Sequence, residues 1–388
     1  MKLLFACFLL VALGATQSLA EIDVPIGYLK VEVEQPPTLS NLDPIPDDLG
    51  TAGAQVGLKD NATTGRFLGH SYDLLNVDVF VGEDPTAAAK ELLGKTQILV
   101  VDAPQDALLA IADLPEAAGS LIFNSGAPDD ALRRDACRAN VLHTIPSYAM
   151  RADALAQFFV KRRWDRLALI EGTHNVDKAY GDALRTALTK FGLKLRSEKT
   201  WAFDADMRRN AAQEVPLFTQ DLKDHDVLLV ADEVQDFGRY IAFNTWEPRP
   251  IAGSAGMRAL GWAAVVEQWG AAQLQSRFFK TASRDMRARD YAAWAAIRTV
   301  GEAVTRTSSG DVTTLRNFIL SAEFELAGFK GRPLSFRTWN GQLRQPIPLT
   351  HPRALVAMAP LEGFLHPVTE LDTLGHDQPE TTCSAFGG

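Results

Sequence analysis

Residues 97–128, QILVVDAPQDALLAIADLPEAAGSLIFNSGAP, contain the pattern that decides the fold. Two short apolar runs, residues 97–101 and 120–123, are typical of strands buried on both faces, and residues 105–114 between them are expected to form a helix. Each run ends in small and polar residues, namely Asp102-Ala103-Pro104 and residues 124–128. A strand, a helix and a second strand in this order predict a parallel sheet covered by helices.

The same alternation continues on both sides of this stretch. Earlier in the chain we expect strands over residues 28–33 and 74–80, and a helix over residues 85–93 that Asp84 caps. Later in the chain the expected elements are strands over 166–170, 194–200 and 226–230 and helices over 149–162, 178–191 and 215–222. Two sets of strands, near 28–123 and 166–253, predict an α/β fold of two doubly wound parallel-sheet lobes, with a crossover near residues 146–150.

The C-terminal part of the chain departs from this alternation. Helices are expected over residues 288–304 and 315–320, followed by a hairpin of residues 334–339 and 342–347 with Asn340-Gly341 as its turn. We expect four parts: a first lobe of residues 21–147 and about 280–335, a second lobe of residues 148–279 and about 336–365, and a C-terminal tail of residues 366–388, after the N-terminal residues 1–20.

Residues 1–20 have the pattern of a secretory signal peptide. Lys2 precedes an apolar run over residues 3–14, and Ser18-Leu19-Ala20 provides a small-x-small cleavage site. The run is shorter than the roughly 20 apolar residues that a membrane-spanning helix needs. We therefore expect cleavage after Ala20 and export of a soluble protein.

Two cysteines remain once a signal peptide with Cys7 is removed, Cys137 and Cys383. An even pair of cysteines in an oxidising compartment is expected to form a disulfide, which would tie the C-terminal tail to the body of the protein. The sequence leaves this bond open, because it does not give the distance between the two residues.

The composition is that of an ordinary globular protein, with 46% hydrophobic and 22% charged residues. The formal net charge of −9 argues against a nucleic-acid-binding or anionic-membrane-binding surface, which clustered Lys and Arg favour. The chain has no nucleophile-elbow, zinc-protease, P-loop or dinucleotide-binding motif, and its histidines are scattered without metal-ligand spacing. We therefore expect a binding protein without a metal or a catalytic cofactor, rather than an enzyme.

Small and polar residues follow the expected strands, where parallel α/β sheets bind their ligands. The candidates for ligand contacts there are Asp102, Asn124, Ser125, Ala127, Lys178, Glu233 and Ser254. The backbone N–H groups and the hydroxyl of residues 124–127 suit a carboxylate or carbonyl oxygen. The same residues are equally suited to a helix cap that needs no ligand.

Aromatic and arginine side chains are concentrated after residue 245. Trp262 and Trp294 lie there, together with Arg258 and Arg284. A planar anion would be bound by such a mixture, because rings can stack on it and guanidinium groups can pair with its carboxylates. The alternative is that the tryptophans lie in the core and the arginines in solvent.

The order of elements and several local motifs resemble the type I periplasmic binding proteins of the leucine/isoleucine/valine kind. The likeness is clearest over residues 125–171, from Ser-Gly-Ala-Pro at 125–128 to Trp-Asp-Arg-Leu-Ala-Leu-Ile-Glu at 164–171. Ala179-Tyr180-Gly181 resembles a Tyr-Gly segment of that family, and residues 291–296, with Trp294, resemble its late Tyr-Asp-Ala helix. The resemblance implies a two-lobed receptor of an ABC importer in the periplasm, usually a monomer.

More narrowly, residues 352–357 (PRALVA) and 364–375 (FLHPVTELDTLG) resemble a divergent subgroup associated with alcohol oxidation that depends on pyrroloquinoline quinone (PQQ). This resemblance implies PQQ as the ligand. Its carboxylates would be held by Lys178, Arg258 and Arg284, its ring would lie against Trp262 or another late tryptophan, and Asn124 and Ser125 would bond a ring oxygen. The family also implies ligand contacts near Asp102, Tyr148, Tyr180, Glu233 and Ser254.

The chain departs from the amino-acid binders of the family at two points. Asp102 stands where a small hydroxyl or glycine is expected, and Ser254-Ala255 stand where an acidic residue often receives the ammonium of the substrate. An unpaired ammonium in a closed cleft is costly, which favours a larger anionic ligand. Three alternatives stay open: a receptor for a branched-chain amino acid or small amide, a ligand-sensing module without a transport role, and an enzyme that pairs Asp102 with Glu233.

Overall fold

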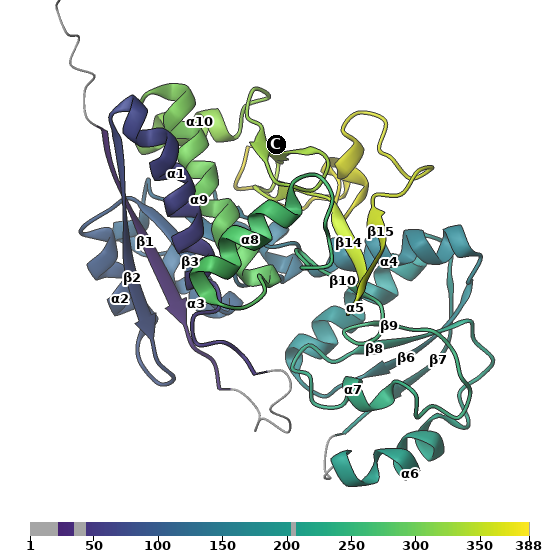
Figure 1. The fold of residues 1–388 in the computed structure, drawn as a ribbon. Coiled ribbons are helices and arrows are strands. Elements are labelled where there is room, and N and C mark those ends of the chain that lie inside the picture. Colours follow the sequence, from purple (N-terminus) through teal and green to yellow (C-terminus); the bar gives the residue numbers. More distant parts are fainter. Residues whose placement is uncertain (1–21, 35–43, 203–206, 388) are drawn as a thin grey trace, which may run out of the picture.

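The computed structural model describes residues 22–34, 44–202 and 207–387. The expected signal peptide, residues 1–20, lies outside the described residues. Within them, no helix combines the length and the apolar composition that crossing a membrane requires. The described chain forms two lobes, each built around a parallel sheet with helices packed against it, as predicted (Figure 1).

The sheet of the first lobe has five parallel strands in the order β2-β1-β3-β4-β5. They are β1 (Ile22–Val31), β2 (His70–Val79), β3 (Ile98–Asp102), β4 (Leu121–Asn124) and β5 (Val141–His143). The connecting helices are α1 (Thr51–Leu68), α2 (Pro85–Leu93) and α3 (Gln105–Ala112), with short 3-10 helices at Pro115–Ala117 and Asp130–Arg133. The predicted cap of α2 is confirmed, because the Asp84 side chain accepts a hydrogen bond of 2.9 Å from the Thr86 N–H.

The sheet of the second lobe has four parallel strands in the order β7-β6-β8-β9. They are β6 (Arg166–Glu171), β7 (Lys194–Thr200), β8 (Val227–Ala231) and β9 (Ile251–Gly253), and the helices are α4 (Tyr148–Arg162), α5 (Asn175–Lys190), α6 (Met207–Thr219) and α7 (Gly238–Ile241). The helix expected over residues 215–222 has the wrong bounds, since α6 runs from Met207 to Thr219. Pro216 lies inside it. Residues 208–214 (RRNAAQE) carry no large apolar side chain that would have marked it.

The last third of the chain adds three helices and two small antiparallel sheets. The helices are α8 (Ala271–Ala282), α9 (Ala288–Thr307) and α10 (Val312–Ile319). One sheet consists of β11 (Leu326–Ala327), β12 (Pro333–Phe336) and β13 (Leu343–Arg344); the other consists of β10 (Arg258–Ala259), β14 (Ile347–His351) and β15 (Ala354–Ala359). Two 3-10 helices follow, at Glu370–Thr373 and Gln378–Glu380.

The predicted hairpin around Asn340-Gly341 is present but shorter, and its turn is wider. β12 pairs with β13 through Phe336 and Leu343, so residues 337–342 form the connection instead of two residues. Gly341 has a φ of 67°, which favours glycine at this position. Ile347 pairs with Ala359 in the other small sheet, because the chain crosses to the second lobe after Arg344.

The apolar clusters show where the chain changes lobe. Trp262 and Phe278 pack in one cluster with residues of β1 and α9, whereas Ile347 and Leu374 pack with residues of α4 and β8. The expected boundaries near residues 280 and 336 lie inside the first of these clusters. We therefore propose that the chain changes lobe near residues 260 and 346 instead.

Three crossovers connect the lobes, and they contact one another. Gln345 Nε2 donates a hydrogen bond of 2.8 Å to the Thr144 carbonyl, and the Leu260 N–H donates one of 3.1 Å to the Pro348 carbonyl. Gly261 lies against Pro146, where an added Cβ would come within 3.1 Å of the proline Cδ. A rotation between the lobes would therefore be shared by all three segments.

Candidate functional site

The carboxyl end of β3 places a buried carboxylate at the edge of the first lobe. The Asp102 side chain is only 2% exposed. Its Oδ2 accepts a long hydrogen bond of 3.5 Å from the Tyr28 hydroxyl, and its Oδ1 receives no hydrogen bond from the described residues. Gly126 allows this arrangement, because a Cβ there would lie 2.4 Å from Oδ1. A buried acceptor without a hydrogen bond is costly.

An arginine from the first turn of α9 lies against this carboxylate. Arg289 Nη1 is 3.4 Å from Asp102 Oδ1, and the Arg289 side chain is 48% exposed. Close packing of α1 on α9 holds this turn in place, since a Cβ on Gly53 would lie 1.9 Å from the Asp290 carbonyl oxygen. The first-lobe edge therefore presents one buried anion beside one solvent-accessible cation.

Asn124 and Ser125 form the loop after β4 and do not point to a ligand. Asn124 Oδ1 accepts hydrogen bonds from the N–H groups of Gly126 and Ala127, and its Nδ2 donates to the Ala127 carbonyl. The Ser125 hydroxyl donates to the Val101 carbonyl, and both side chains are buried completely. The structural alternative, a cap without ligand, therefore describes these two side chains, whose donors are engaged within the protein, and the expected bond to a ring oxygen stays a prediction.

The edge of the second lobe carries a buried ion pair from α4 and the loop after β8. Arg151 donates to both carboxylate oxygens of Glu233, at 2.6 and 2.9 Å, and the Ser254 hydroxyl donates to Glu233 at 2.7 Å. Burial alone would raise the pKa of Glu233, but the charge and the hydrogen bonds of Arg151 outweigh it and hold this pKa below its ordinary value. The pair is therefore charged at neutral pH.

Two tyrosines lie against the Arg151 guanidinium. It lies 4.4 Å from the centre of the Tyr180 ring and 5.6 Å from that of Tyr148, and the two rings are 5.5 Å apart. Burial raises the pKa of Tyr180 to about 12, so this hydroxyl stays protonated. The two rings and the Glu233 carboxylate thus surround the guanidinium at this edge.

Tyr148 connects the two edges. Its N–H donates a hydrogen bond of 2.9 Å to the Pro128 carbonyl in the loop after β4. Burial first, and then the charge of Glu233, raises the pKa of its hydroxyl, and the charges of Arg151 and Arg289 oppose this rise. Because α4 begins at Tyr148, which bonds the first-lobe loop, and carries Arg151 of the second-lobe ion pair, we take the region between Asp102 and Glu233 as the candidate site.

Several expected contacts lie elsewhere. Arg284 is bonded to Asp290, at 2.7 and 2.9 Å, and to Asp48 at 2.8 Å. The Trp262 ring stacks on Tyr291 at 4.8 Å, and the Trp294 indole N–H donates to Asp60 at 3.0 Å. Both tryptophans lie in the first-lobe core, so a role in ring stacking with a ligand is wrong for them.

The three remaining candidate residues, Lys178, Arg258 and Ala127, lie in different surroundings. Lys178 is exposed on α5, and Arg258 on β10 is close enough to Glu233 for its charge to lower the pKa of that carboxyl. Ala127 is buried in the loop after β4. Sequence reasoning missed Arg151 and Arg289. Arg151 lies in the first turn of α4, which follows the first crossover, and Arg289 lies in the first turn of α9. An arginine at the start of a helix was the signal that the sequence offered for these two residues.

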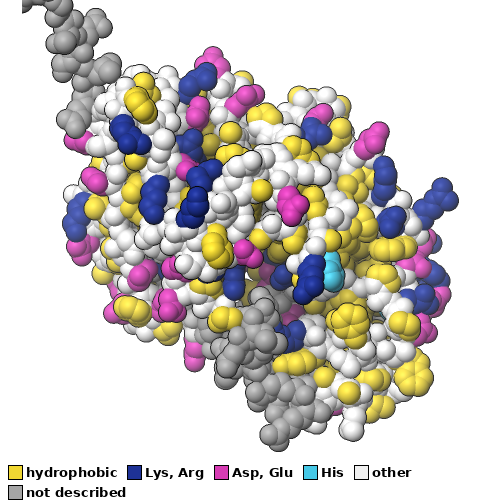
Figure 2. Space-filling model, viewed as in Figure 1, with side chains coloured by type: hydrophobic (Ala, Val, Ile, Leu, Met, Phe, Trp, Pro, Cys, Tyr) yellow, Lys and Arg dark blue, Asp and Glu magenta, His cyan; other side chains and the backbone are white. Residues whose placement is uncertain are grey.

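Among residues 22–34, 44–202 and 207–387, no three His, Cys, Asp or Glu side chains come together as metal ligands. Acidic and basic side chains are mixed over the face of the molecule in Figure 2. Both observations describe only the part of the chain that the structure covers.

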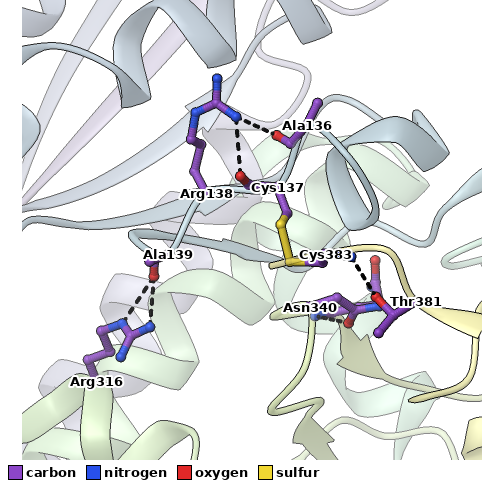
Figure 3. The surroundings of a disulfide bond; sticks show 9 residues. Ala136, Cys137, Arg138, Ala139, Arg316, Asn340, Thr381 and Cys383 are labelled. Carbon is purple, nitrogen blue, oxygen red and sulfur yellow. Dashed lines mark hydrogen bonds between the residues drawn. A yellow bond between two sulfur atoms is a disulfide. The ribbon is translucent and has the colours of Figure 1, made fainter. Parts of the chain in front are cut away.

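The two cysteines that the sequence singled out form a disulfide (Figure 3). Their Cα atoms are 5.7 Å apart, and the bond closes a sequence separation of 246 residues. Cys137 precedes β5 in the first lobe, and Cys383 lies near the C-terminus. The bond therefore ties the end of the chain to the first lobe.

No family model matches the chain, and no curated protein matches it. Solved structures, in contrast, match the chain. A branched-chain amino acid ABC transporter periplasmic ligand-binding protein from Burkholderia xenovorans has a TM-score of 0.72 at 14% identity, over 94% of this chain and 100% of that one. A solute-binding protein from R. palustris in complex with benzoate has a TM-score of 0.66 at 14% identity, over 93% and 99%.

A third similar structure is the branched-chain amino acid transporter substrate-binding protein of Streptococcus pneumoniae in complex with isoleucine. It has a TM-score of 0.63 at 14% identity and covers 86% of this chain and 98% of that one. These neighbours are type I periplasmic binding proteins, and their names describe solute binding rather than catalysis. The chain therefore has the two-lobed fold of the type I periplasmic binding proteins.

Proposed function

We propose that the protein is a periplasmic solute receptor of an ABC importer, and that its ligand is a small zwitterion such as a branched-chain amino acid. The observation that carries this proposal is the pair of Asp102 and Arg289, an anion and a cation side by side at the edge of the first lobe. Asp102 Oδ1 receives no hydrogen bond from the residues that the structure describes, and Arg289 lies 3.4 Å away. A zwitterion supplies a partner to each.

In this proposal the ligand exchanges partners with the ion pair. Its ammonium donates to Asp102 Oδ1, which removes the cost of a buried acceptor without a hydrogen bond. Arg289 then turns its guanidinium to the ligand carboxylate, for which two parallel N–H donors are well suited. Asp102 thus supplies the acidic partner that Ser254-Ala255 cannot, so the small residues at 254–255 do not disfavour an amino acid as the ligand.

When the second lobe closes over the ligand, the charges of its Arg151 and Glu233 already neutralise each other. Arg151 and Glu233 satisfy each other, and Tyr148 and Tyr180 are buried against the guanidinium, so this ion pair needs no charged partner from the ligand. Closure about the three crossovers would bury the ligand between the two edges.

PQQ has weaker support as the ligand. Of the three cations expected to hold its carboxylates, Arg284 is bonded to two carboxylates of the protein. Trp262 and Trp294, expected to lie against or near its ring, are core residues. The similar structures are named for branched-chain amino acids and benzoate, which agrees better with a smaller ligand.

The periplasmic location rests on two further observations. Residues 1–20 have a signal-peptide pattern, and a disulfide such as Cys137–Cys383 persists in oxidising compartments. A sensor that binds the same ligand without an importer would share both features. Uptake by cells with and without the protein separates transport from sensing.

A thermal-shift screen tests the ligand class. Purified protein from residue 21 onward is melted with leucine, isoleucine, valine, benzoate and PQQ, each in excess. A ligand at about 100 times its Kd adds about 2.7 kcal/mol to the free energy of unfolding, a readily measured rise in melting temperature. We expect the rise with at least one branched-chain amino acid. A rise with PQQ alone would contradict the proposed ligand class.

A further inference from the structure

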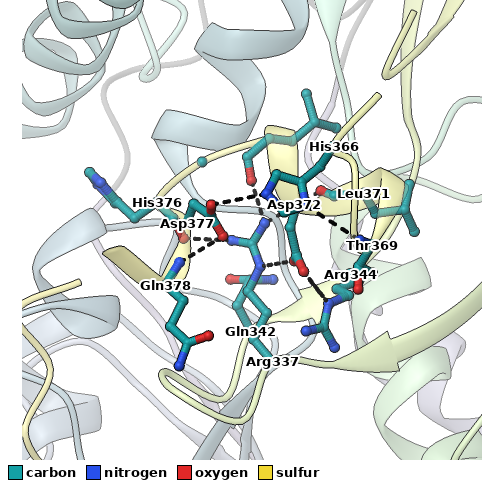
Figure 4. A network of polar contacts seen from close by, with 12 residues as sticks. Arg337, Gln342, Arg344, His366, Thr369, Leu371, Asp372, His376, Asp377 and Gln378 are labelled. Carbon is teal, nitrogen blue, oxygen red and sulfur yellow. Dashed lines mark hydrogen bonds and ion pairs between the residues drawn. The ribbon is translucent and has the colours of Figure 1, made fainter. Parts of the chain in front are cut away.

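The C-terminal segment, residues 366–387, is bonded to the first lobe through a buried carboxylate (Figure 4). Asp372 accepts hydrogen bonds of 2.8 Å from both Arg337 and Arg344, and all three side chains are nearly or mostly buried. Arg337 also donates to the carbonyls of Leu374 and His376. The two arginines flank the hairpin β12–β13, whose Phe336 and Leu343 lie in the first-lobe core.

The residues that follow Asp372 are bonded to the second lobe. The Leu374 side chain is buried in the cluster formed by α4 and β8. The Gly375 N–H donates a hydrogen bond of 2.8 Å to Asp153 of α4, and its carbonyl accepts one of 3.0 Å from Lys190 of α5. Residues 372–376 therefore contact both lobes within five positions of the chain.

The end of the segment returns to the first lobe. Cys383 is bonded to Cys137, and Phe386 packs beside Gly341 and under the Arg316 guanidinium of α10 at 5.7 Å. The segment thus crosses from the first lobe to the second and back, with one attachment covalent.

We propose that residues 366–387 are a strap that restrains the relative motion of the two lobes. The strap lies next to the crossovers: Gln342, in the turn that begins with Arg337, donates to the carbonyls of His143 and Ile145 in the first crossover. Three crossovers alone leave two lobes free to rotate about them. A fourth connection beside them limits that rotation. Its consequence for ligand affinity rests on the proposed function, but the restraint itself does not.

The restraint is measured by the distance between the lobes in protein without ligand. Nitroxide labels on Gln55→Cys in α1 and Lys194→Cys in β7, both exposed positions, report this distance by double electron–electron resonance. The native disulfide stays formed, so only the introduced thiols are labelled. Two changes loosen the strap: Cys137→Ser with Cys383→Ser, and Lys190→Met.

Lys199→Met is the matched control. Lys190 and Lys199 have side chains 30% and 25% exposed, and each bonds a backbone carbonyl and a carboxylate. The partners of Lys199, Phe218 and Asp221, lie in the second lobe, whereas Lys190 bonds the strap.

We expect both strap variants to broaden the distance distribution relative to the parent, and Lys199→Met to leave it unchanged. If the variant without the native disulfide does not fold, Lys190→Met still decides the matter. Distributions as narrow as the parent in folded strap variants, or equal broadening in Lys199→Met, would overturn the proposal. Because no ligand is present, a failed ligand screen and a failed strap test are separate results.

Discussion

Arg289 of α9 lies 3.4 Å from Asp102 at the end of β3, an exposed cation beside a buried anion. The two residues are far apart in the sequence and meet because α9 packs on the first-lobe sheet. The exposed partner can leave while the buried one stays, because the two share no hydrogen bond. This difference makes the pair suited to exchange with a ligand.

Arg289→Gln is expected to weaken ligand binding without unfolding the protein. Removing the charge would cost about tenfold or more in affinity, because the ligand carboxylate loses its guanidinium. Melting temperature without ligand should change little, because the half-exposed Arg289 side chain shares no hydrogen bond with Asp102. Arg306→Gln, at an exposed position near the other end of α9, is the control. Equal affinities for the two variants would remove Arg289 from the site.

Glu233→Gln is expected to destabilise the second lobe. It leaves Arg151 buried against Tyr180 without a counter-charge, which costs about 3 kcal/mol of unfolding free energy. The double variant Arg151→Met with Glu233→Gln should lose less than the sum of the two single variants. Urea unfolding measures all four proteins. Additive losses would show that the two side chains do not act as a pair.

Loss of the disulfide is expected to destabilise the whole protein. The bond spans 246 residues, and a loop of this size corresponds to a loss of up to about 5 kcal/mol by the chain-entropy model. Cys137→Ser with Cys383→Ser, and the parent protein reduced with a dithiol, should unfold at similarly lowered denaturant concentrations. A reduced parent that unfolds like the oxidised one would contradict this expectation.

Asp153 of α4, which accepts a hydrogen bond from the Gly375 N–H, gives the protein a stability that depends on pH. Burial raises the pKa of Asp153 to about 6, although Lys190 opposes the rise. The folded protein therefore holds this proton more tightly than the unfolded chain, whose aspartates titrate near about 4. Stability from this group is present below about pH 4 and is lost as the pH rises through about 6.

Asp153→Asn removes this loss. Between pH 4 and pH 7 its free energy of unfolding should gain on that of the parent by about 3 kcal/mol. Asp165→Asn, at an exposed position, should keep a constant difference from the parent. A constant difference for Asp153→Asn as well would mean that its pKa is not raised.

The sequence predicted the fold well where local patterns suffice. β7 matches its predicted bounds, residues 194–200, and Asp84 caps α2 as expected. β1 begins at Ile22, before the alternation that marked it, because pairing with β2 extends the strand over residues that carry no pattern of their own. The wide turn of residues 337–342 was missed because bonds to Asp372 and Ile145, far along the chain, shape it.

The site was harder to predict, because composition does not say which way a side chain faces. The mixture of Trp and Arg after residue 245 suggested a ligand surface, but Trp262 stacks on Tyr291 in the core and Arg284 is bonded to Asp290. Asp102 was correctly placed at a strand end. Its partner Arg289 depends on the packing of α9, which no local pattern reveals.

The most direct test of the account is a calorimetric titration of the parent protein and of Asp102→Asn with leucine, isoleucine and valine, with PQQ as the comparison. We predict one site per chain for at least one amino acid in the parent, and a loss of about 30-fold or more in affinity in Asp102→Asn, as expected when a buried charge pair loses one member. Equal affinity in the two proteins would contradict the role proposed for Asp102. A parent that binds PQQ and none of the amino acids would contradict the proposed ligand class.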